Sequence, residues 1–243
     1  MSKARNAGLA ALPPNIEFVS FLDADDIWLP DFLEVTYSKL KCDSEAVACH
    51  TLGKFIDSDG NDIRLGECEA MCRVRPTLHG SSVGPSDILE PTTLSTLIIS
   101  GAIVAPSAVL FRREVIAKIN GFDPKFQICA DWNLYLRAAK YGRFLFVESA
   151  LLGYRQHGGN MSTNQERQKE EQRRVVQAAL SSIEYSDEQR LLLRRSFKAG
   201  QRYLFKQKLI LSVGALKRLK VRQCVQQLAY GIKHLIRFIS GTP

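Results

Sequence analysis

Three aspartates follow a short apolar run near the beginning of the chain. The run extends from Phe18 to Leu22, interrupted only by a serine, and Asp23, Asp25 and Asp26 come directly after it. Like charges packed at the end of a buried strand cost free energy unless a cation neutralises them. Carboxylate oxygens suit Mg²⁺ and Mn²⁺, which usually serve phosphate groups. The segment therefore predicts a metal–diphosphate site at the carboxyl end of a central strand, where open α/β sheets place their ligands.

Asp23 and Asp25 form a D-x-D pair. On a strand, residues i and i+2 point to the same side, so both carboxylates are expected to face one ion. Asp26 would then point away and cap the following turn. The alternative is that all three are turn or helix-capping carboxylates, because a D-x-D alone is a weak motif. Its place after an apolar strand and before Ile27 to Pro30 favours the metal interpretation.

Two further segments carry groups that could act on a phosphate or a hydroxyl. Asp131 is at the start of an expected helix, where a carboxylate is either a plain cap or a general base that deprotonates a hydroxyl. Arg155 and His157 precede two glycines in a later loop. Arginine binds phosphate bidentately, and histidine can ligate a metal or stabilise a leaving diphosphate. A polar surface loop is the alternative for this second segment.

The elements that must position these residues alternate between strands and helices. Hydrophobic periodicity predicts strands over residues 16–22, 46–50, 108–111 and 144–147, with residues 151–157 extended or turn-like. It predicts helices over residues 4–12, 29–41, 94–100, 113–119 and 131–141. A hairpin is expected to turn at residues 59–60, and residues 66–92 are expected to be irregular. From residue 164 the pattern is helical, with helices over 166–183, 187–210 and 216–239.

Charge divides the chain into an acidic body and a basic tail. The formal net charge is +8, yet residues 190–243 contain thirteen Lys/Arg and no Asp/Glu, which leaves −5 for residues 1–189. The tail allows three interpretations. It could be an amphipathic segment at an anionic membrane surface, or a helical subdomain packed on the body with a solvated basic face. Nucleic-acid binding is the weakest of the three interpretations, because the tail contains no recognisable nucleic-acid-binding motif.

Cysteine usage and hydropathy bear on the compartment. The six cysteines form no CxxC pair and match no familiar zinc spacing, so free thiols are expected. The N-terminus lacks the apolar segment of a signal peptide, and no uncharged apolar run approaches the ~18 residues of a spanning helix. We therefore expect a cytoplasmic protein. If the tail binds an anionic membrane surface, the protein would lie peripherally at the inner face of the membrane.

Taken in order, these motifs resemble the family 2 glycosyltransferases of the GT-A fold. The matching segments are Ala4–Gly8, Phe21–Pro30, Ala105–Glu114, Gly121–Pro124, Ala130–Arg137 and Tyr154–His157. The resemblance implies an α/β fold: a partial GT-A, Rossmann-like mixed sheet flanked by helices, with an α-helical C-terminal tail. It implies a glycosyltransferase domain over residues 1–163 and a basic helical region over residues 164–243.

The resemblance also implies roles for individual residues. Asp23 and Asp25 match the D-x-D that holds a divalent metal, Mg²⁺ or Mn²⁺, and the diphosphate of a nucleotide-sugar donor. Asp131 matches the general base of inverting members, and Arg155 and His157 match the late loop that closes over the diphosphate.

Arg5 and Asn6, from the first matching segment, join the donor-binding residues. The implied reaction is metal-assisted transfer of a sugar to the hydroxyl of a glycan or lipid-linked acceptor in glycan or polysaccharide assembly.

The chain departs from the family pattern at two places. Ala130 stands where family members usually carry Glu just before the base. The strand–helix–strand half that binds the nucleoside in complete members is also absent before Met1, so we expect a truncation of a longer parent. A late start codon, a split gene and completion by a partner chain stay open. The alternative function is a catalytically inactive remnant or subunit that acts as an interaction or membrane-docking module.

Overall fold

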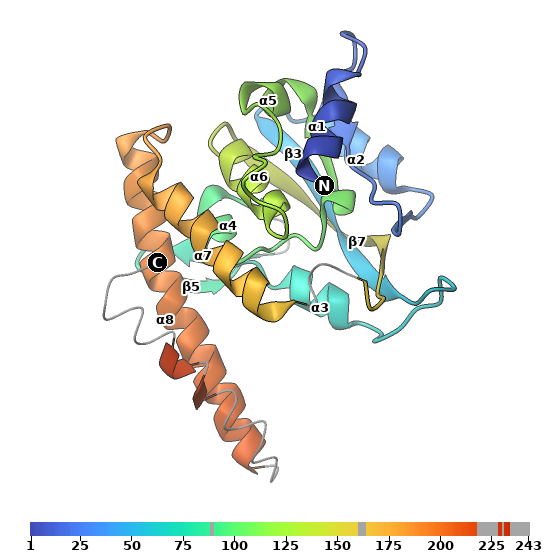
Figure 1. Cartoon of the computed structure of the whole chain (residues 1–243). Helices are drawn as coiled ribbons and strands as arrows, with labels where there is room; N and C mark the ends of the chain where they lie inside the picture. The colour runs from blue at the N-terminus through green and yellow to red at the C-terminus, as the bar shows by residue number, and fades with distance from the viewer. Residues whose placement is uncertain (88–89, 160–163, 218–227, 230, 234–243) are drawn as a thin grey trace.

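A mixed sheet forms the centre of the protein (Figure 1). The computed structural model describes residues 1–87, 90–159, 164–217, 228–229 and 231–233. The five strands lie in the order β1-β6-β3-β7-β2, and only the β3–β7 pair is parallel. Their bounds are β1 Phe18–Ser20, β2 Ile27–Trp28, β3 Ala46–Ile56, β6 Val109–Arg112 and β7 Arg143–Arg155. This arrangement confirms the predicted mixed α/β architecture.

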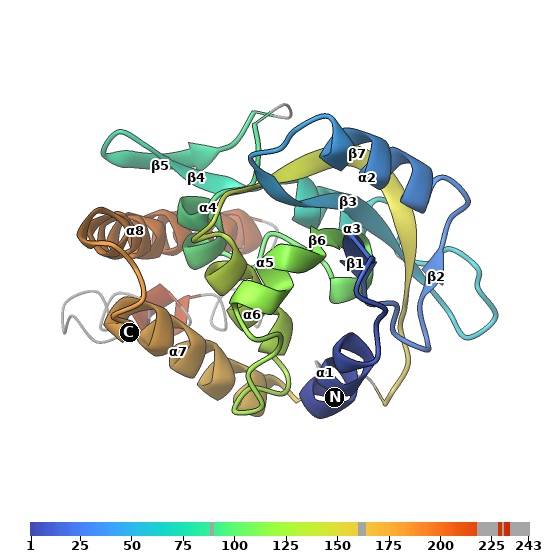
Figure 2. The same ribbon diagram turned by 90° about the horizontal axis from the view of Figure 1, so that it is seen from above.

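Helices cover both faces of the sheet because side chains alternate along each strand (Figure 2). Val109 and Phe111 of β6 pack into the larger apolar core beneath the α4–α6 helices, whereas Leu110 packs with α2 on the other face. The helices of this region are α1 Ser2–Ala10, α2 Phe32–Lys41, α3 Glu67–Arg73, α4 Leu94–Ile99, α5 Arg113–Lys118 and α6 Ala130–Ala138. Each helix predicted from periodicity is present within a few residues.

The strand before the aspartates differs from its prediction. β1 has three residues, of which only Val19 is buried, and it pairs with β6 alone at the edge of the described sheet. The prediction of a buried central strand over residues 16–22 is therefore wrong. The strands predicted over 46–50 and 144–147 are the first parts of β3 and β7, which continue to Ile56 and Arg155. The turn predicted at residues 59–60 is confirmed by the positive φ of Gly60 and by a bridge between Ile56 and Asp62.

Residues 66–92 are more ordered than predicted. They contain α3 and a hairpin of β4 Pro76–His79 and β5 Ser82–Pro85, which turns at Gly80 with a φ of 62°. The buried guanidinium of Arg75 lies 4.0 Å above the ring of Phe146 and donates to the carbonyl oxygens of Asp87 and Glu90. These contacts join positions distant in sequence, which is why local pattern did not reveal them.

Two long helices complete the described structure: α7 Gln165–Ser181 and α8 Asp187–Lys217. Val175 of α7 and Leu193 of α8 belong to the core, and a Cβ added at Gly200 would lie 2.8 Å from Ile99 of α4. The described beginning of the tail therefore packs on the body, while the helix predicted over 216–239 lies largely outside the described residues. No helix in the described part of the chain is long and apolar enough to cross a membrane.

Candidate functional site

The three aspartates lie in the turn between β1 and β2, not on a strand. The N–H of Asp26 donates to the carbonyl oxygen of Asp23 at 3.0 Å, which closes the turn. The i and i+2 argument for Asp23 and Asp25 therefore does not apply, and each carboxylate has its own side-chain partner. Arg5 of α1 forms an ion pair with Asp23, and Nε2 of His157 lies 2.9 Å from Oδ2 of Asp25.

Asp26 is buried and holds the turn in place. Its two oxygens accept hydrogen bonds from the Ser107 hydroxyl at 2.6 Å and from the Arg155 N–H at 3.1 Å. Burial raises the pKa of Asp26 to about 6, while these two hydrogen bonds oppose the shift. The carboxylate joins the aspartate turn to the end of β7. The sequence had predicted only that Asp26 caps the following turn.

Asn6 and Arg155 are bound to the backbone. Nδ2 of Asn6 donates to the Phe122 carbonyl oxygen at 2.8 Å, and its Oδ1 accepts from the Phe122 N–H at 2.8 Å. A side chain at Gly121 would collide with Asn6, since an added Cβ lies 2.5 Å from its Oδ1. Arg155 donates to the carbonyl oxygens of Asp25, Asp57 and Ser58 at 2.7, 2.5 and 2.6 Å. Both residues therefore hold elements together, and the donor contacts predicted for them stay predictions.

Asp131 is in the first turn of α6 and is half-buried. Its Oδ1 accepts from the Trp132 N–H at 2.8 Å. Burial raises the pKa of Asp131 to about 6, while this hydrogen bond and the charge of Arg5 lower it. The carboxylate is thus ionised at neutral pH yet basic enough to accept a proton, which are the properties of a general base.

One cavity of about 620 Å³ brings five of the predicted residues together: Arg5, Asp23, Asp25, Asp131 and His157. They come from α1, the β1–β2 turn, α6 and the segment after β7. Asn6 and Arg155 are not among the residues that line this cavity. The arrangement places a carboxylate–imidazole pair and a guanidinium in the same cavity as a carboxylate with a raised pKa.

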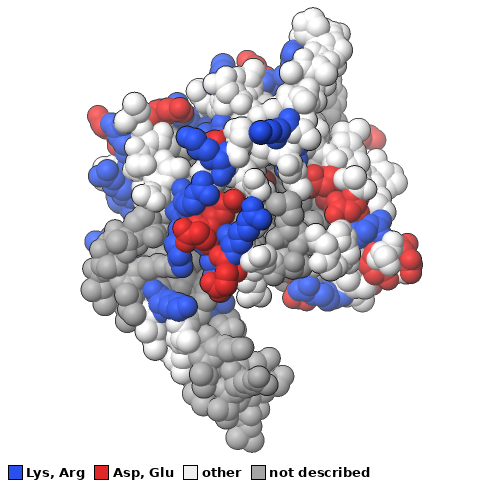
Figure 3. Space-filling view, in the orientation of Figure 1, with Lys and Arg blue, Asp and Glu red and all other residues white. Residues whose placement is uncertain are grey.

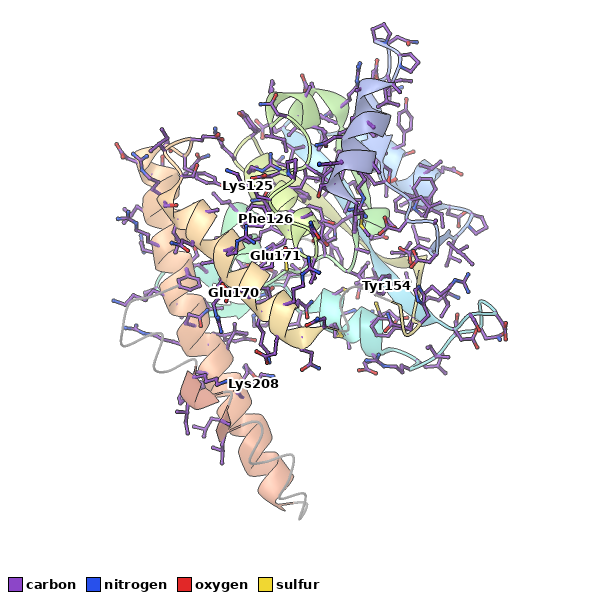
Figure 4. The ribbon with its side chains drawn as sticks, viewed as in Figure 1. Lys125, Phe126, Tyr154, Glu170, Glu171 and Lys208 are labelled. Atoms are coloured by element: carbon purple, nitrogen blue, oxygen red, sulfur yellow. The ribbon has the colours of Figure 1, made fainter. Side chains whose placement is uncertain are left out.

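A buried glutamate that sequence reasoning missed fixes the segment before Asp131. The carboxylate of Glu171 in α7 accepts from the N–H groups of Gln127 at 3.0 Å, of Ile128, and of Cys129 at 2.6 Å. Figure 4 shows Glu171 beside the segment that contains Lys125 and Phe126. Glu171 lies 44 residues from Gln127 in sequence, so no local signal could have indicated the contact.

We expect Glu171→Ala to lower the free energy of unfolding by about 2–4 kcal/mol, because three backbone N–H groups lose a charged acceptor. Chemical denaturation measures this change. Glu170→Ala is the matched control, since Glu170 is exposed and forms a surface ion pair with Arg173 that is worth about 1 kcal/mol at most. Equal effects of the two substitutions would contradict the assignment.

Comparison with known proteins identifies the family of this chain. The family model described as glycosyltransferase like family 2 matches residues 1–179. The chain is 30% identical over 161 residues to an uncharacterized glycosyltransferase of Nostoc sp., covering 65% of this chain and 44% of that protein. It is 49% identical over 37 residues to the succinoglycan biosynthesis protein ExoW of Rhizobium meliloti, covering 15% of this chain and 12% of that protein. The chain thus spans less than half the length of these relatives.

A solved structure shows the same fold. The mannosyltransferase PcManGT from Pyrobaculum calidifontis, in complex with GDP-Man and Mn²⁺, superposes with a TM-score of 0.57 at 15% identity. The match covers 100% of this chain and 67% of that one. At this identity the likeness shows the fold, a GT-A mixed sheet flanked by helices. Because the family match extends over most of the sequence, the chain belongs to the glycosyltransferase like family 2.

Proposed function

We propose that the chain transfers a sugar from a nucleotide-diphosphate sugar to an acceptor hydroxyl in glycan or polysaccharide assembly. The observation that carries the proposal is the single cavity that Asp25, His157, Arg5 and Asp131 line together. The first three residues offer groups for a metal and a diphosphate, and Asp131 offers a base. Family membership supports a transferase, and the residue roles are part of the proposal.

Asp25 and His157 would hold the divalent metal, Mg²⁺ or Mn²⁺. Oδ2 and Nε2 lie 2.9 Å apart on half-exposed side chains, so both can turn to one cation. The described residues contain no group of three or more possible metal-binding side chains, which fits a site completed by phosphate oxygens and water. Asp23, also predicted as a metal ligand, is paired with Arg5 and would position that guanidinium beside the diphosphate. When bound, the metal supplies Lewis-acid stabilisation of the leaving diphosphate.

Asp131 would remove the proton of the acceptor hydroxyl as its oxygen attacks the anomeric carbon. A new C–O bond forms, the bond from that carbon to the diphosphate breaks, and the diphosphate leaves with the electron pair. A single displacement of this kind inverts the anomeric configuration. The half-buried position of Asp131 keeps the carboxylate poorly hydrated, which raises its affinity for the proton.

Titration with Mn²⁺ and nucleotides tests the proposal. We expect UDP or GDP to bind in the presence of Mn²⁺ by isothermal titration calorimetry, and the binding to disappear with EDTA. Hydrolysis of UDP-glucose, UDP-galactose, UDP-N-acetylglucosamine and GDP-mannose would then identify the donor. A chain that binds neither nucleotide and hydrolyses no donor would contradict the proposal and favour a non-catalytic subunit.

The rate of transfer should depend on pH through Asp131. Its pKa is raised to about 6, so the base is protonated below that pH and ionised above it. We expect kcat to increase about tenfold per pH unit below pH 6 and to level off above it. A cation at Asp25 would move this limb down in pH. The pKa of Asp26 is raised to the same range. If the decrease of kcat below pH 6 persists in Asp131→Asn, another group causes it, and the role of Asp131 is contradicted.

A further inference from the structure

A second cavity of about 630 Å³ lies between the body and the two C-terminal helices. Asp131 lines both this cavity and the one that contains the aspartate turn. Val104, Ile128 and Tyr154 also line both cavities. Figure 4 shows Tyr154, which belongs to β7. A molecule in the second cavity would therefore reach the proposed base from a cavity that Asp23, Asp25 and His157 do not line.

Both C-terminal helices turn one face to this cavity. Gln168, Gln172 and Val176 recur every four residues along α7, and all three line it. Phe197, Gln201 and Leu204 form the corresponding stripe on α8. The stripes combine amide groups with apolar and aromatic surface. Figure 2 shows α7 and α8 on the same side of the body as α6.

Two buried hydroxyl groups indicate that a polar ligand belongs in the cavity. Tyr135 lines it, is 1% exposed, and is four residues after Asp131 on α6. Its hydroxyl oxygen and the Oγ of Ser100, another lining residue, have no hydrogen-bond partner among the described residues. Native proteins rarely leave buried polar atoms unpaired, so a ligand that carries hydroxyl groups would complete them.

The charges at the cavity are balanced. Lys169 and Arg173 of α7 line it, and each forms an ion pair with a glutamate of the same helix, Glu166 or Glu170. Lys233 and Asp131 also line it and carry opposite charges. Figure 3 shows acidic and basic side chains intermixed on this face of the molecule. The chemistry that remains for recognition is amide, hydroxyl and aromatic, which suits an uncharged ligand with many hydroxyl groups and apolar C–H faces.

We infer that this cavity binds the sugar unit of a glycan acceptor, and that α7 and α8 form the wall that selects it. The inference rests on the proposed sugar transfer, since it assigns the acceptor to the cavity that adjoins the donor cavity at Asp131. The helical region is then part of the substrate site and not only a support for the body. Gln168 and Gln172 are the specificity-determining residues, because both line the cavity from one helix and carry amide groups.

Binding of methyl glycosides tests the inference without turnover. Saturation-transfer NMR with the methyl glycosides of glucose, galactose, mannose and N-acetylglucosamine should detect binding of at least one to the full chain. Gln172→Ala should weaken that binding about fivefold, the usual effect of losing one hydrogen bond. Gln177→Ala is the matched control, since Gln177 is exposed on the same helix and does not line the cavity.

The outcomes separate this inference from the proposed function. Neither Gln172→Ala nor Gln177→Ala should change Mn²⁺-dependent nucleotide binding, and Asp25→Asn should not change glycoside binding. Absence of binding by all four glycosides, or equal weakening by the two glutamine substitutions, would overturn the inference. Loss of nucleotide binding by the unaltered chain would instead count against the proposed function, with the glycoside result still standing by itself.

Discussion

Replacing Asp131 with asparagine is expected to lower kcat for sugar transfer by a factor of about 10²–10⁴, the usual contribution of a general base. Asparagine keeps the size of the side chain and an acceptor oxygen for the Trp132 N–H, so α6 should be preserved. It removes only the ability to take a proton. The affinity for the nucleotide should stay within about twofold, because the side chains proposed to bind the metal and the diphosphate, Asp25, His157 and Arg5, are unchanged.

Initial rates of transfer with saturating donor, together with nucleotide titration, would measure the two effects separately. Asp123→Asn is a suitable control, because Asp123 accepts from the Lys125 N–H in the same region but does not line the cavity. A fall in nucleotide affinity as large as the fall in kcat would show that Asp131 acts through binding or folding. That result would contradict its assignment as the base.

Asp25→Asn is expected to weaken Mn²⁺-dependent nucleotide binding by about 10- to 100-fold, since a charged ligand is replaced by a neutral one. Asp23→Asn should reduce it much less, because the carboxylate of Asp23 is occupied by Arg5. This difference would distinguish two sets of metal ligands. The geometry favours Asp25 and His157, whereas the family resemblance implies Asp23 and Asp25. Electron paramagnetic resonance of Mn²⁺ reports the bound fraction directly.

His157→Ala should resemble Asp25→Asn if the two side chains share one cation. Asp31→Asn is the matched control, as Asp31 lies close in sequence, is exposed, and does not line the cavity. Equal losses for Asp23→Asn and Asp25→Asn would mean that the Arg5–Asp23 ion pair opens when the metal binds. The proposal that Asp25 and His157 alone supply the protein ligands would then be wrong.

The residues that hold the site are as informative as those that line it. Asp26 joins the aspartate turn to β7 through Ser107 and the Arg155 N–H, and Glu171 joins α7 to the segment before Asp131. Both carboxylates are buried and accept more than one hydrogen bond. Asp26, Ser107 and Arg155 lie inside the motifs of the family resemblance, whereas Glu171 lies outside them. Glu171 therefore gives α7 a direct role in fixing the segment before α6.

By itself the sequence determined the order of the longer strands and of the helices outside residues 66–92, and the position of Asp131 at a helix start. These features depend on side-chain periodicity and on turn residues, which act over a few positions. The helices α7 and α8 were also readable in this way. The length and edge position of β1 were not, because they depend on its pairing with β6 alone.

Only the tertiary structure decided which polar residues face the cavity. Arg155 donates to the Asp25 carbonyl oxygen across 130 positions, and Asn6 binds the Phe122 backbone across 116, so both side chains hold distant segments together. Glu171 and the second cavity likewise depend on the packing of α7 against α6. A residue type states which hydrogen bonds a side chain can form. Long-range packing selects the partner, and with it whether the residue holds the fold or meets a substrate.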